Sequence, residues 1–313
     1  MKILITGGAG YIGGALTDIL SHTKHSIKVY DSLLYEENYR KDVDFIFGDI
    51  RNTDKLSKLT KWADVVVWLA ALVGDGACAL NPDVALAINE KTVKWLSSVY
   101  DGRVIFTSTC SVYGAQDKEL DELSSTKPLS VYASSKLRAE NHLKNKNSLI
   151  FRLGTLFGIG DRFSRIRLDL VVNIMTVRAY KDGGLKVFGG RQYRPLLHVK
   201  DSARAIFENL NTNHTGIYNL SRENINMHDL SLRVKKHFPK LKIQKEEMKF
   251  EDARNYQVKN AKAKKMLNFH AKYTIDQGIE ELKQLLEEKR IADVNNPRYG
   301  NQTFLTKFSK YLV

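Results

Sequence analysis

The chain has 313 residues, of which 43% are hydrophobic and 27% are charged, and its formal net charge is +14. This length allows one large domain or two modest ones, and the lack of an apolar stretch of about 18 residues argues against a membrane span, so we expect no membrane partner. Only two cysteines occur, Cys78 and Cys110, so we expect no disulfide framework. The first predicted strand begins at the N-terminus, so we expect no secretory signal. Both observations lead us to place the protein in the reducing cytoplasm.

The N-terminal segment predicts a site for a dinucleotide. Residues 2–6 are an apolar run that suits a buried parallel strand, and residues 11–20 have the apolar spacing of a helix. Between them, glycines permit a tight turn, close approach of a phosphate to the backbone and close packing of the helix on the strand. The unpaired N–H groups and the positive dipole end of the helix favour a pyrophosphate at its start. The residues predicted to form this site are Gly7, Gly10, Tyr11, Ile12 and Gly13.

A second apolar run, residues 27–31, ends in a carboxylate, Asp31, which lies eighteen residues after Gly13. An acid at this place can accept hydrogen bonds from the adenosine ribose hydroxyls, and it would repel a 2′-phosphate. The cofactor predicted from this pattern is therefore NAD rather than NADP. The alternative is that Asp31 only caps a helix or closes a turn.

Strands and helices alternate through the rest of the first half of the chain. This alternation predicts a doubly wound parallel sheet with helices on both faces and ligands beyond the carboxyl ends of the strands. Further strands are predicted at 45–47, 65–69, 104–106 and 149–153, and helices near 53–61, 82–100 and 131–146.

After about residue 155 the pattern changes. Helices are predicted at 168–181, 199–210, 227–238 and 274–289, with short strands at 216–220 and 241–245. We therefore expect an α/β protein with an NAD-binding Rossmann domain over residues 1–155. A smaller mixed α/β lobe over residues 156–313 would bind substrate, with segments such as 194–210 packing back on the first domain. The final residues, 290–313, carry aromatic side chains without a clear period, and would either wrap the domain or join a subunit interface.

The positive charge is concentrated in residues 233–272, which contain thirteen Lys or Arg residues and only four Asp or Glu residues. Such a segment raises the question of nucleic-acid binding. The basic residues are, however, scattered among apolar ones at amphipathic spacing, without a nucleic-acid module. We expect a solvated, lysine-rich face, with an anionic small substrate as a secondary reason for the charge, and no nucleic-acid partner.

Tyr132 and Lys136 are four residues apart in a segment rich in helix formers, so both side chains lie on one helical face. A tyrosine with a pKa of about 10 is a poor base at neutral pH. A neighbouring ammonium group, helped by a bound nicotinamide cation, stabilises the phenolate and lowers that pKa. The phenolate can then remove a proton from a substrate hydroxyl as a hydride leaves the same carbon. The alternative is a tyrosine–lysine pair that only decorates a surface helix.

Several further motifs follow one another along the chain, and together with this pair they resemble the extended short-chain dehydrogenase/reductase family. Within that family the likeness is to nucleotide-sugar epimerases and dehydratases. It covers most of the chain and is strongest through residue 205. The motifs are the glycine loop, Asp49-Ile50, Ala70-Ala71, Asn89, residues 107–114, Tyr132 with Lys136, residues 152–158 and residues 194–201.

The resemblance implies roles for particular residues in catalysis and cofactor binding. Thr109 would hydrogen-bond the sugar hydroxyl beside Tyr132, and Lys136 would also hold the nicotinamide ribose. Asp49 and Ile50 would border the adenine. The other implied cofactor contacts are Ala70 and Ala71, along the pyrophosphate and ribose, and Asn89.

The resemblance also implies substrate contacts. Arg194 and Arg254 match arginines that grip the diphosphate of the substrate, a use that suits the planar guanidinium group. Asn173 matches a contact to substrate phosphate or backbone. Arg254 also lies in the basic segment 233–272, where it would be one of many surface charges.

The chain departs from the family pattern in two places. Members that eliminate water carry an Asp-Glu pair directly after the threonine, where this chain has Cys110 and Ser111, so we do not expect dehydration. Cys110 would either contact the sugar or fill the core. Segment 158–173 lacks the Gly-Pro turn of many epimerases, and Arg165 and Arg167 within it would either recognise a sugar other than a plain UDP-hexose or brace the following helix.

These observations lead us to expect an NAD-dependent enzyme that acts on C4 of a nucleotide sugar through a 4-keto species, with 4-epimerisation as the leading hypothesis. A 4-dehydrogenase or 4-ketoreductase, for a deoxysugar or heptose of a surface polysaccharide, needs the same Thr-Tyr-Lys group and stays open. A non-catalytic protein that senses NAD is a third hypothesis, and the presence of all three residues counts against it. By family likeness we expect a homodimer through helices 82–100 and 131–146.

Overall fold

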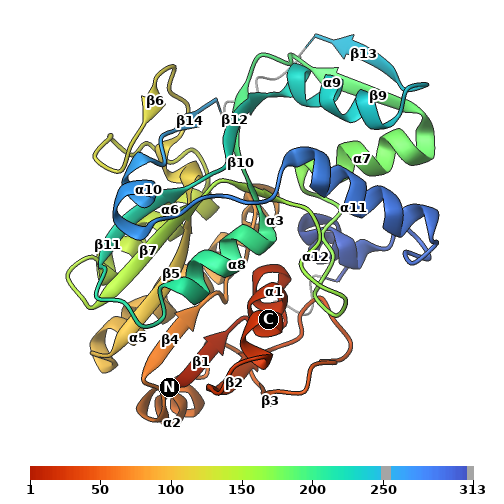
Figure 1. Cartoon of the computed structure of the whole chain (residues 1–313). Coiled ribbons are helices and arrows are strands. Elements are labelled where there is room, and N and C mark those ends of the chain that lie inside the picture. Colours follow the sequence, from red (N-terminus) through yellow and green to blue (C-terminus); the bar gives the residue numbers. More distant parts are fainter. Residues whose placement is uncertain (248–254, 309–313) are drawn as a thin grey trace.

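The computed structural model describes residues 1–247 and 255–308, and its centre is a seven-stranded parallel sheet (Figure 1). The strand order is β11-β7-β5-β4-β1-β2-β3. The chain thus runs outward from β1 to one edge and then outward from β4 to the other, which leaves a crevice beyond the carboxyl ends of β1 and β4. The strands are β1 (Lys2–Thr6), β2 (Ser26–Asp31), β3 (Asp44–Phe47), β4 (Val65–Trp68), β5 (Arg103–Thr109), β7 (Ser148–Leu153) and β11 (Gly216–Leu220).

Alternate residues of these strands face two hydrophobic cores, because successive side chains of a strand point to opposite faces of the sheet. Ile3 and Ile5 of β1 pack in the core that α1 (Tyr11–Ser21) and α8 (Val199–Glu208) cover. Leu4, between them, packs in the core on the other face. The helices of that second face are α2 (Thr53–Trp62), α5 (Thr92–Val99) and α6 (Val131–Leu143).

The strands and helices predicted for the first half of the chain are confirmed. The predicted helix 82–100 consists of α4 (Pro82–Leu86), a wide π-helical segment η1 (Ala87–Lys91) and α5 in direct succession. The helix α3 (Asp75–Leu80), which follows the loop after β4, was not predicted, and neither were α10 (Ala261–Leu267) and α12 (Asn301–Lys307) in the second half. The small residues of α3 carry no helical periodicity that could be seen in the sequence.

The second lobe contains two small sheets, in the orders β12-β10-β8 and β13-β9, packed with three helices around a separate core. The predicted helices of this region and the strand near 241–245 are confirmed, whereas the other short strands were not predicted. The helices are α7 (Val171–Asp182), α9 (Met227–His237) and α11 (Ile275–Glu287). The strands are β8 (Thr155–Phe157), β9 (Gly184–Phe188), β10 (Tyr193–His198), β12 (Glu223–Asn226) and β13 (Lys242–Glu246).

The chain crosses between the two lobes more than once. Strand β11 pairs with β7 as the edge of the main sheet, and α8 packs on α1, as Figure 1 shows. Strand β11 and helix α8, which both follow residue 155 in the chain, therefore pack on the main sheet and its covering helix. The remaining elements are η2 (Cys110–Tyr113), β6 (Glu119–Leu120), β14 (Gln257–Val258), α10 (Ala261–Leu267), η3 (Pro297–Tyr299) and α12 (Asn301–Lys307).

The described part of the basic segment 233–272 agrees with a solvated face. Its lysines are exposed, and the apolar residues between them, such as Val234, Leu241 and Leu267, are buried. Throughout the described ranges, every helix is too short or too polar to cross a bilayer.

The turn from β1 into α1 is tight because glycine backbone touches backbone there. Gly7 has φ +76°, and a Cβ at this position would lie 2.6 Å from the backbone nitrogen of Ala70. A Cβ at Gly13 would lie 2.5 Å from the carbonyl oxygen of Gly7. Any larger residue would push the start of α1 away from the crevice.

We predict that Gly7→Ala destabilises the protein more than Gly183→Ala does. Both glycines have positive φ, but a Cβ at Gly183 would meet no atom within 4 Å. The left-handed backbone alone costs about 1–2 kcal/mol, and the clash at Gly7 adds a further cost of about 1–3 kcal/mol. Urea unfolding of both variants measures the difference, and equal losses would show that steric contact at this turn is unimportant.

Candidate active site

A cavity of about 740 Å³ opens beyond the carboxyl ends of the strands and is closed on its far side by the second lobe. Most of the site residues predicted from the sequence line it. Those that do are Gly7, Gly10, Tyr11, Ile12, Gly13, Asp31, Asp49, Ile50, Ala70, Ala71, Thr109, Tyr132, Lys136 and Arg194. The topology thus brings residues from both halves of the chain to one space.

The N-terminus of α1 forms the floor of this cavity. Gly10 is the N-cap, and no side chain caps the first turn, so the N–H groups at the start of the helix stay available to an anion. The Tyr11 hydroxyl donates a hydrogen bond to the carbonyl of Gly158. That bond ties the first turn of α1 to the second lobe.

Asp31 lies at the end of β2 with its carboxylate held by two backbone N–H groups. Oδ2 accepts a hydrogen bond from Ala9 at 3.0 Å, and Oδ1 accepts one from Leu33 at 2.8 Å. Each carboxylate oxygen has a second lone pair, which leaves both able to accept from ribose hydroxyls. Asp31 therefore closes the turn and also lines the cavity, and its contact with a ribose stays a prediction. The glycine turn, the uncapped helix start and this acid together fit a dinucleotide.

Thr109, Tyr132 and Lys136 converge on the same cavity, Thr109 from the end of β5 and the other two from α6. The Lys136 side chain is only 2% exposed, and its Nζ lies 4.1 Å from the centroid of the Phe106 ring. Burial lowers the pKa of Lys136 to about 7. Burial also raises the pKa of Tyr132 above its usual range. Near pH 7, Tyr132 is therefore neutral and Lys136 is only partly protonated.

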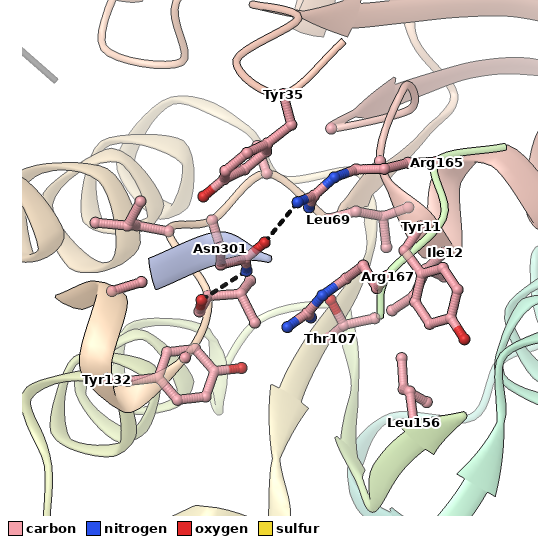
Figure 2. Close-up of a pocket in the computed structure, with 18 of the residues that line it drawn as sticks. Tyr11, Ile12, Tyr35, Leu69, Thr107, Tyr132, Leu156, Arg165, Arg167 and Asn301 are labelled. Atoms are coloured by element: carbon pink, nitrogen blue, oxygen red, sulfur yellow. Dashed lines mark hydrogen bonds between the residues drawn. The ribbon is translucent and has the colours of Figure 1, made fainter. Parts of the chain in front are cut away.

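The charges that act on Tyr132 differ from the sequence-based expectation, which assigned the main effect to Lys136. After burial, the Cys78 and Asp75 side chains raise the pKa of Tyr132, and Arg167 lowers it. Figure 2 shows why Arg167 matters, since its guanidinium group and the Tyr132 hydroxyl point into the same space. Arg167 is held in a bidentate pair with Asp169, at 2.9 Å for both hydrogen bonds.

A buried ion pair fixes α6 against the sheet. Glu140 accepts hydrogen bonds from Arg152 of β7, from Nη2 at 2.7 Å and from Nε at 3.0 Å. The Ser108 hydroxyl also donates to Glu140, and Arg152 Nη1 donates to the Tyr113 hydroxyl at 2.9 Å. Glu140 lies one turn beyond Lys136 on α6, and Ser108 precedes Thr109 on β5, so this network sets the catalytic groups relative to one another.

Three predicted contact residues lie outside the cavity, with their polar groups used by the protein itself. Asn89 brackets the backbone of Leu72, accepting from its N–H at 2.8 Å and donating to its carbonyl at 2.9 Å. Asn173 accepts from Gly158 N–H at 3.0 Å, and the fully buried Cys110 thiol donates to the Arg152 carbonyl. These residues shape the walls, and of the two interpretations of Cys110 the core position is the one observed. Arg254 lies outside the described residues.

The C-terminal segment, whose course the sequence left open, forms part of the cavity wall. Asn301, Gln302 and Thr303 line the cavity, and Phe304 and Leu305 of α12 pack in a hydrophobic cluster that Tyr132 adjoins. The described part of the segment therefore wraps the domain, and only the aromatic residues of the tail hinted at this packing.

Asp75, from the unpredicted α3, also lines the cavity and accepts a hydrogen bond from the Ser130 hydroxyl at 2.7 Å.

Comparison with known proteins gives a consistent result. The sequence model of the NAD dependent epimerase/dehydratase family matches residues 3–221. The chain is 26% identical over 306 residues to the UDP-glucuronate 4-epimerase of Thermodesulfobacterium geofontis, covering 88% of this chain and 93% of that protein. It is 25% identical over 336 residues to the UDP-N-acetyl-alpha-D-glucosaminuronate decarboxylase of Bacillus cytotoxicus, covering 92% and 98%. The fold is similar to that of the Thermus thermophilus UDP-glucose 4-epimerase solved with NAD, with a TM-score of 0.78, 20% identity, and coverage of 90% and 99%.

We predict that Lys136→Met changes how stability depends on pH in the NAD-free protein. The folded pKa of Lys136 is about 7, and an unfolded lysine titrates near ~10.4. Between these values the unfolded chain binds more protons, so this lysine makes the free energy of unfolding rise with pH by up to about 1.4 kcal/mol per pH unit. The variant should be more stable than the wild type near pH 7 and lose that advantage toward pH 10.

Urea unfolding at a series of pH values measures this effect, with Lys94→Met, which removes an exposed lysine of α5, as the matched control. The control should follow the wild-type curve. Parallel curves for Lys136→Met and the wild type would contradict the burial of an uncharged amine.

Proposed function

Because the chain belongs to the NAD dependent epimerase/dehydratase family, whose model matches residues 3–221, we propose that it is a nucleotide-sugar 4-epimerase that works through a 4-keto sugar. The observation that carries this proposal is the convergence of Thr109, Tyr132 and Lys136 on a cavity that also holds a dinucleotide-binding turn. The 4-epimerases among its relatives and structural neighbours support a reaction at C4.

The Tyr132 hydroxyl is the group placed to exchange a proton with the sugar. Its phenolate removes the proton of the C4 hydroxyl, and the same oxygen returns a proton when C4 is reduced again. When bound, NAD supplies the acceptor and donor of the hydride. Arg167 places positive charge near the phenolate, and this charge opposes the effect of burial on the pKa of Tyr132.

Thr109 is suited to orient the sugar. Its Oγ1 accepts a hydrogen bond from the N–H of Ser111 at 3.1 Å, so its own hydroxyl proton is available to donate to a sugar oxygen. A donor fixed in this way holds the C4 oxygen close to Tyr132.

The residues after Thr109 favour epimerisation over dehydration. Elimination of water needs an acid and a base beside the sugar, and this chain has a fully buried thiol at Cys110 and a hydroxyl at Ser111. The Ser111 hydroxyl lies 3.1 Å from that of Tyr256. Neither group is a carboxylate that could take up or release a proton near neutral pH.

We predict that Tyr132→Phe lowers kcat by at least about 100-fold while the NAD content of the purified protein stays unchanged, because only the proton-transferring hydroxyl is lost. Tyr180→Phe, which changes a tyrosine of α7 outside the cavity, is the control and should retain full activity. Comparable turnover by Tyr132→Phe and the wild type would rule out this mechanism.

The assay should use UDP-, GDP- and dTDP-linked sugars, with product stereochemistry and NADH absorbance followed together. Epimerisation inverts C4 without accumulation of NADH. Stoichiometric NADH with a keto product would replace the epimerase by a 4-dehydrogenase, and consumption of added NADH by a keto-sugar would replace it by a 4-ketoreductase.

A further inference from the structure

Two buried arginines of the second lobe face the dinucleotide half of the cavity. Arg165 and Arg167 are 6% and 9% exposed, and both line the cavity. They belong to residues 161–169, here called the arginine loop. In Figure 2 both guanidinium groups point into the space between Tyr35 and Tyr132. The Nε of Arg165 is buried without a hydrogen-bond partner, so part of its donor capacity is unused.

The position of Arg165 is set before any ligand binds. Its Nη2 donates to the carbonyl of Arg298 at 3.1 Å and to Oδ1 of Asn301 at 2.8 Å. Its guanidinium carbon lies 3.7 Å from the centroid of the Tyr35 ring. Burial lowers the pKa of Arg165 to about 10, which still leaves the group charged near neutral pH. A cation held this firmly loses little entropy when it pairs with an anion.

Arg165 lies on the dinucleotide side of the cavity, and Arg167 lies between that side and Tyr132. Arg165 acts electrostatically on Asp31, the acid at the end of β2, and stacks on Tyr35 in the loop that follows β2. Arg167 acts on Tyr11 at the start of α1. Arg165 is thus close enough to act on the acid that ends β2, and Arg167 on the first turn of α1, whose N–H groups suit a diphosphate.

The arginine loop is clamped to the first domain, which keeps this alignment. Lys41 pairs with Asp161 and also donates to the carbonyl of Gly14 in α1, and the Lys41 and Asp161 side chains are each only 8% exposed. A Cβ at Gly14 would lie 2.7 Å from the Cα of Ser164, so the loop rests directly on α1. Asp169 forms an ion pair with Arg167, whereas Asp31 and Glu36 act on Arg165 through space.

We infer that Arg165 and Arg167 complete the NAD site from the second lobe by pairing with the cofactor diphosphate, opposite the N-terminus of α1. Helix N–H groups would hold the diphosphate from one side and guanidinium groups from the other. A dinucleotide held from both sides dissociates slowly, as a reaction that returns its hydride to the same sugar requires. The inference rests on the NAD dependence of the family and not on chemistry at C4.

The test is the rate at which NAD leaves the loaded full-length protein, measured by ultrafiltration and quantification of released NAD. Loss of a charge-assisted hydrogen bond should make release about 10- to 100-fold faster in Arg165→Met. The matched control is Arg162→Met, which removes an exposed arginine of the same loop and should leave the rate unchanged. Arg165→Lys keeps the charge but loses the planar guanidinium group, so its NAD release should be slower than that of Arg165→Met and faster than that of Arg162→Met. This variant supplies the comparison if Arg165→Met does not fold.

Binding to NAD-free protein identifies the group that is recognised. Arg165→Met should weaken ADP-ribose about as much as NAD and leave adenosine, which has no diphosphate, within about twofold of wild type. Equal losses of affinity for adenosine and ADP-ribose would overturn the inference. They would show that the substitution acts through the contact of Arg165 with the Tyr35 ring or through the fold, and not through the diphosphate. Weaker binding of UDP to the NAD-loaded variant with unchanged NAD release would also overturn it, since the arginines would then read the substrate. A chain that passes these tests but has no epimerase activity would refute only the proposed function.

Discussion

The buried ion pair between Glu140 and Arg152 is the interaction on which the rest of the site depends. Two charges removed from water are tolerated here because the pairing is bidentate and because the Ser108 and Tyr113 hydroxyls complete the hydrogen bonding. Glu140 shares α6 with Tyr132 and Lys136, and Ser108 is the neighbour of Thr109 on β5. One network behind the cavity therefore joins the strand that carries Thr109 to the helix that carries Tyr132 and Lys136.

Burial shifts the pKa values of Tyr132 and Lys136, both on α6, in opposite directions. It disfavours the phenolate of Tyr132 and the ammonium of Lys136, so each shifts toward its neutral form. The same low polarity strengthens the electrostatic effect of nearby charges on Tyr132, both that of Arg167 and that of a bound nicotinamide ring. In the proposed mechanism, the reactivity of Tyr132 depends on how fully the cavity is occupied, so proton transfer is coupled to the binding of cofactor and substrate.

The cavity is closed by segments that lie far apart in the chain. The loop after β2, the arginine loop 161–169 and the C-terminal residues around Asn301 meet above the dinucleotide groove, joined by the contacts of Lys41, Arg165 and Arg298. In the proposed reaction, such a roof would keep water from the reacting carbon and hold the cofactor in place. Both properties suit a redox-neutral reaction, in which the same cofactor must be present when the keto-sugar is reduced.

The sequence by itself determined the parallel sheet, the dinucleotide turn and the Tyr132–Lys136 pair, because local patterns carry them: apolar runs, glycine spacing, and a helical repeat that puts both side chains on one face. Thr109 was identified through the family resemblance. Only the tertiary structure decided the course of the tail, the return of β11 to the main sheet, and the inward positions of Asn89, Asn173 and Cys110. A polar side chain looks the same in a sequence whether it meets a ligand or a backbone carbonyl. The difference lies in long-range packing, which also turned Arg165 and Arg167 from two charges in an irregular loop into a wall of the cofactor groove.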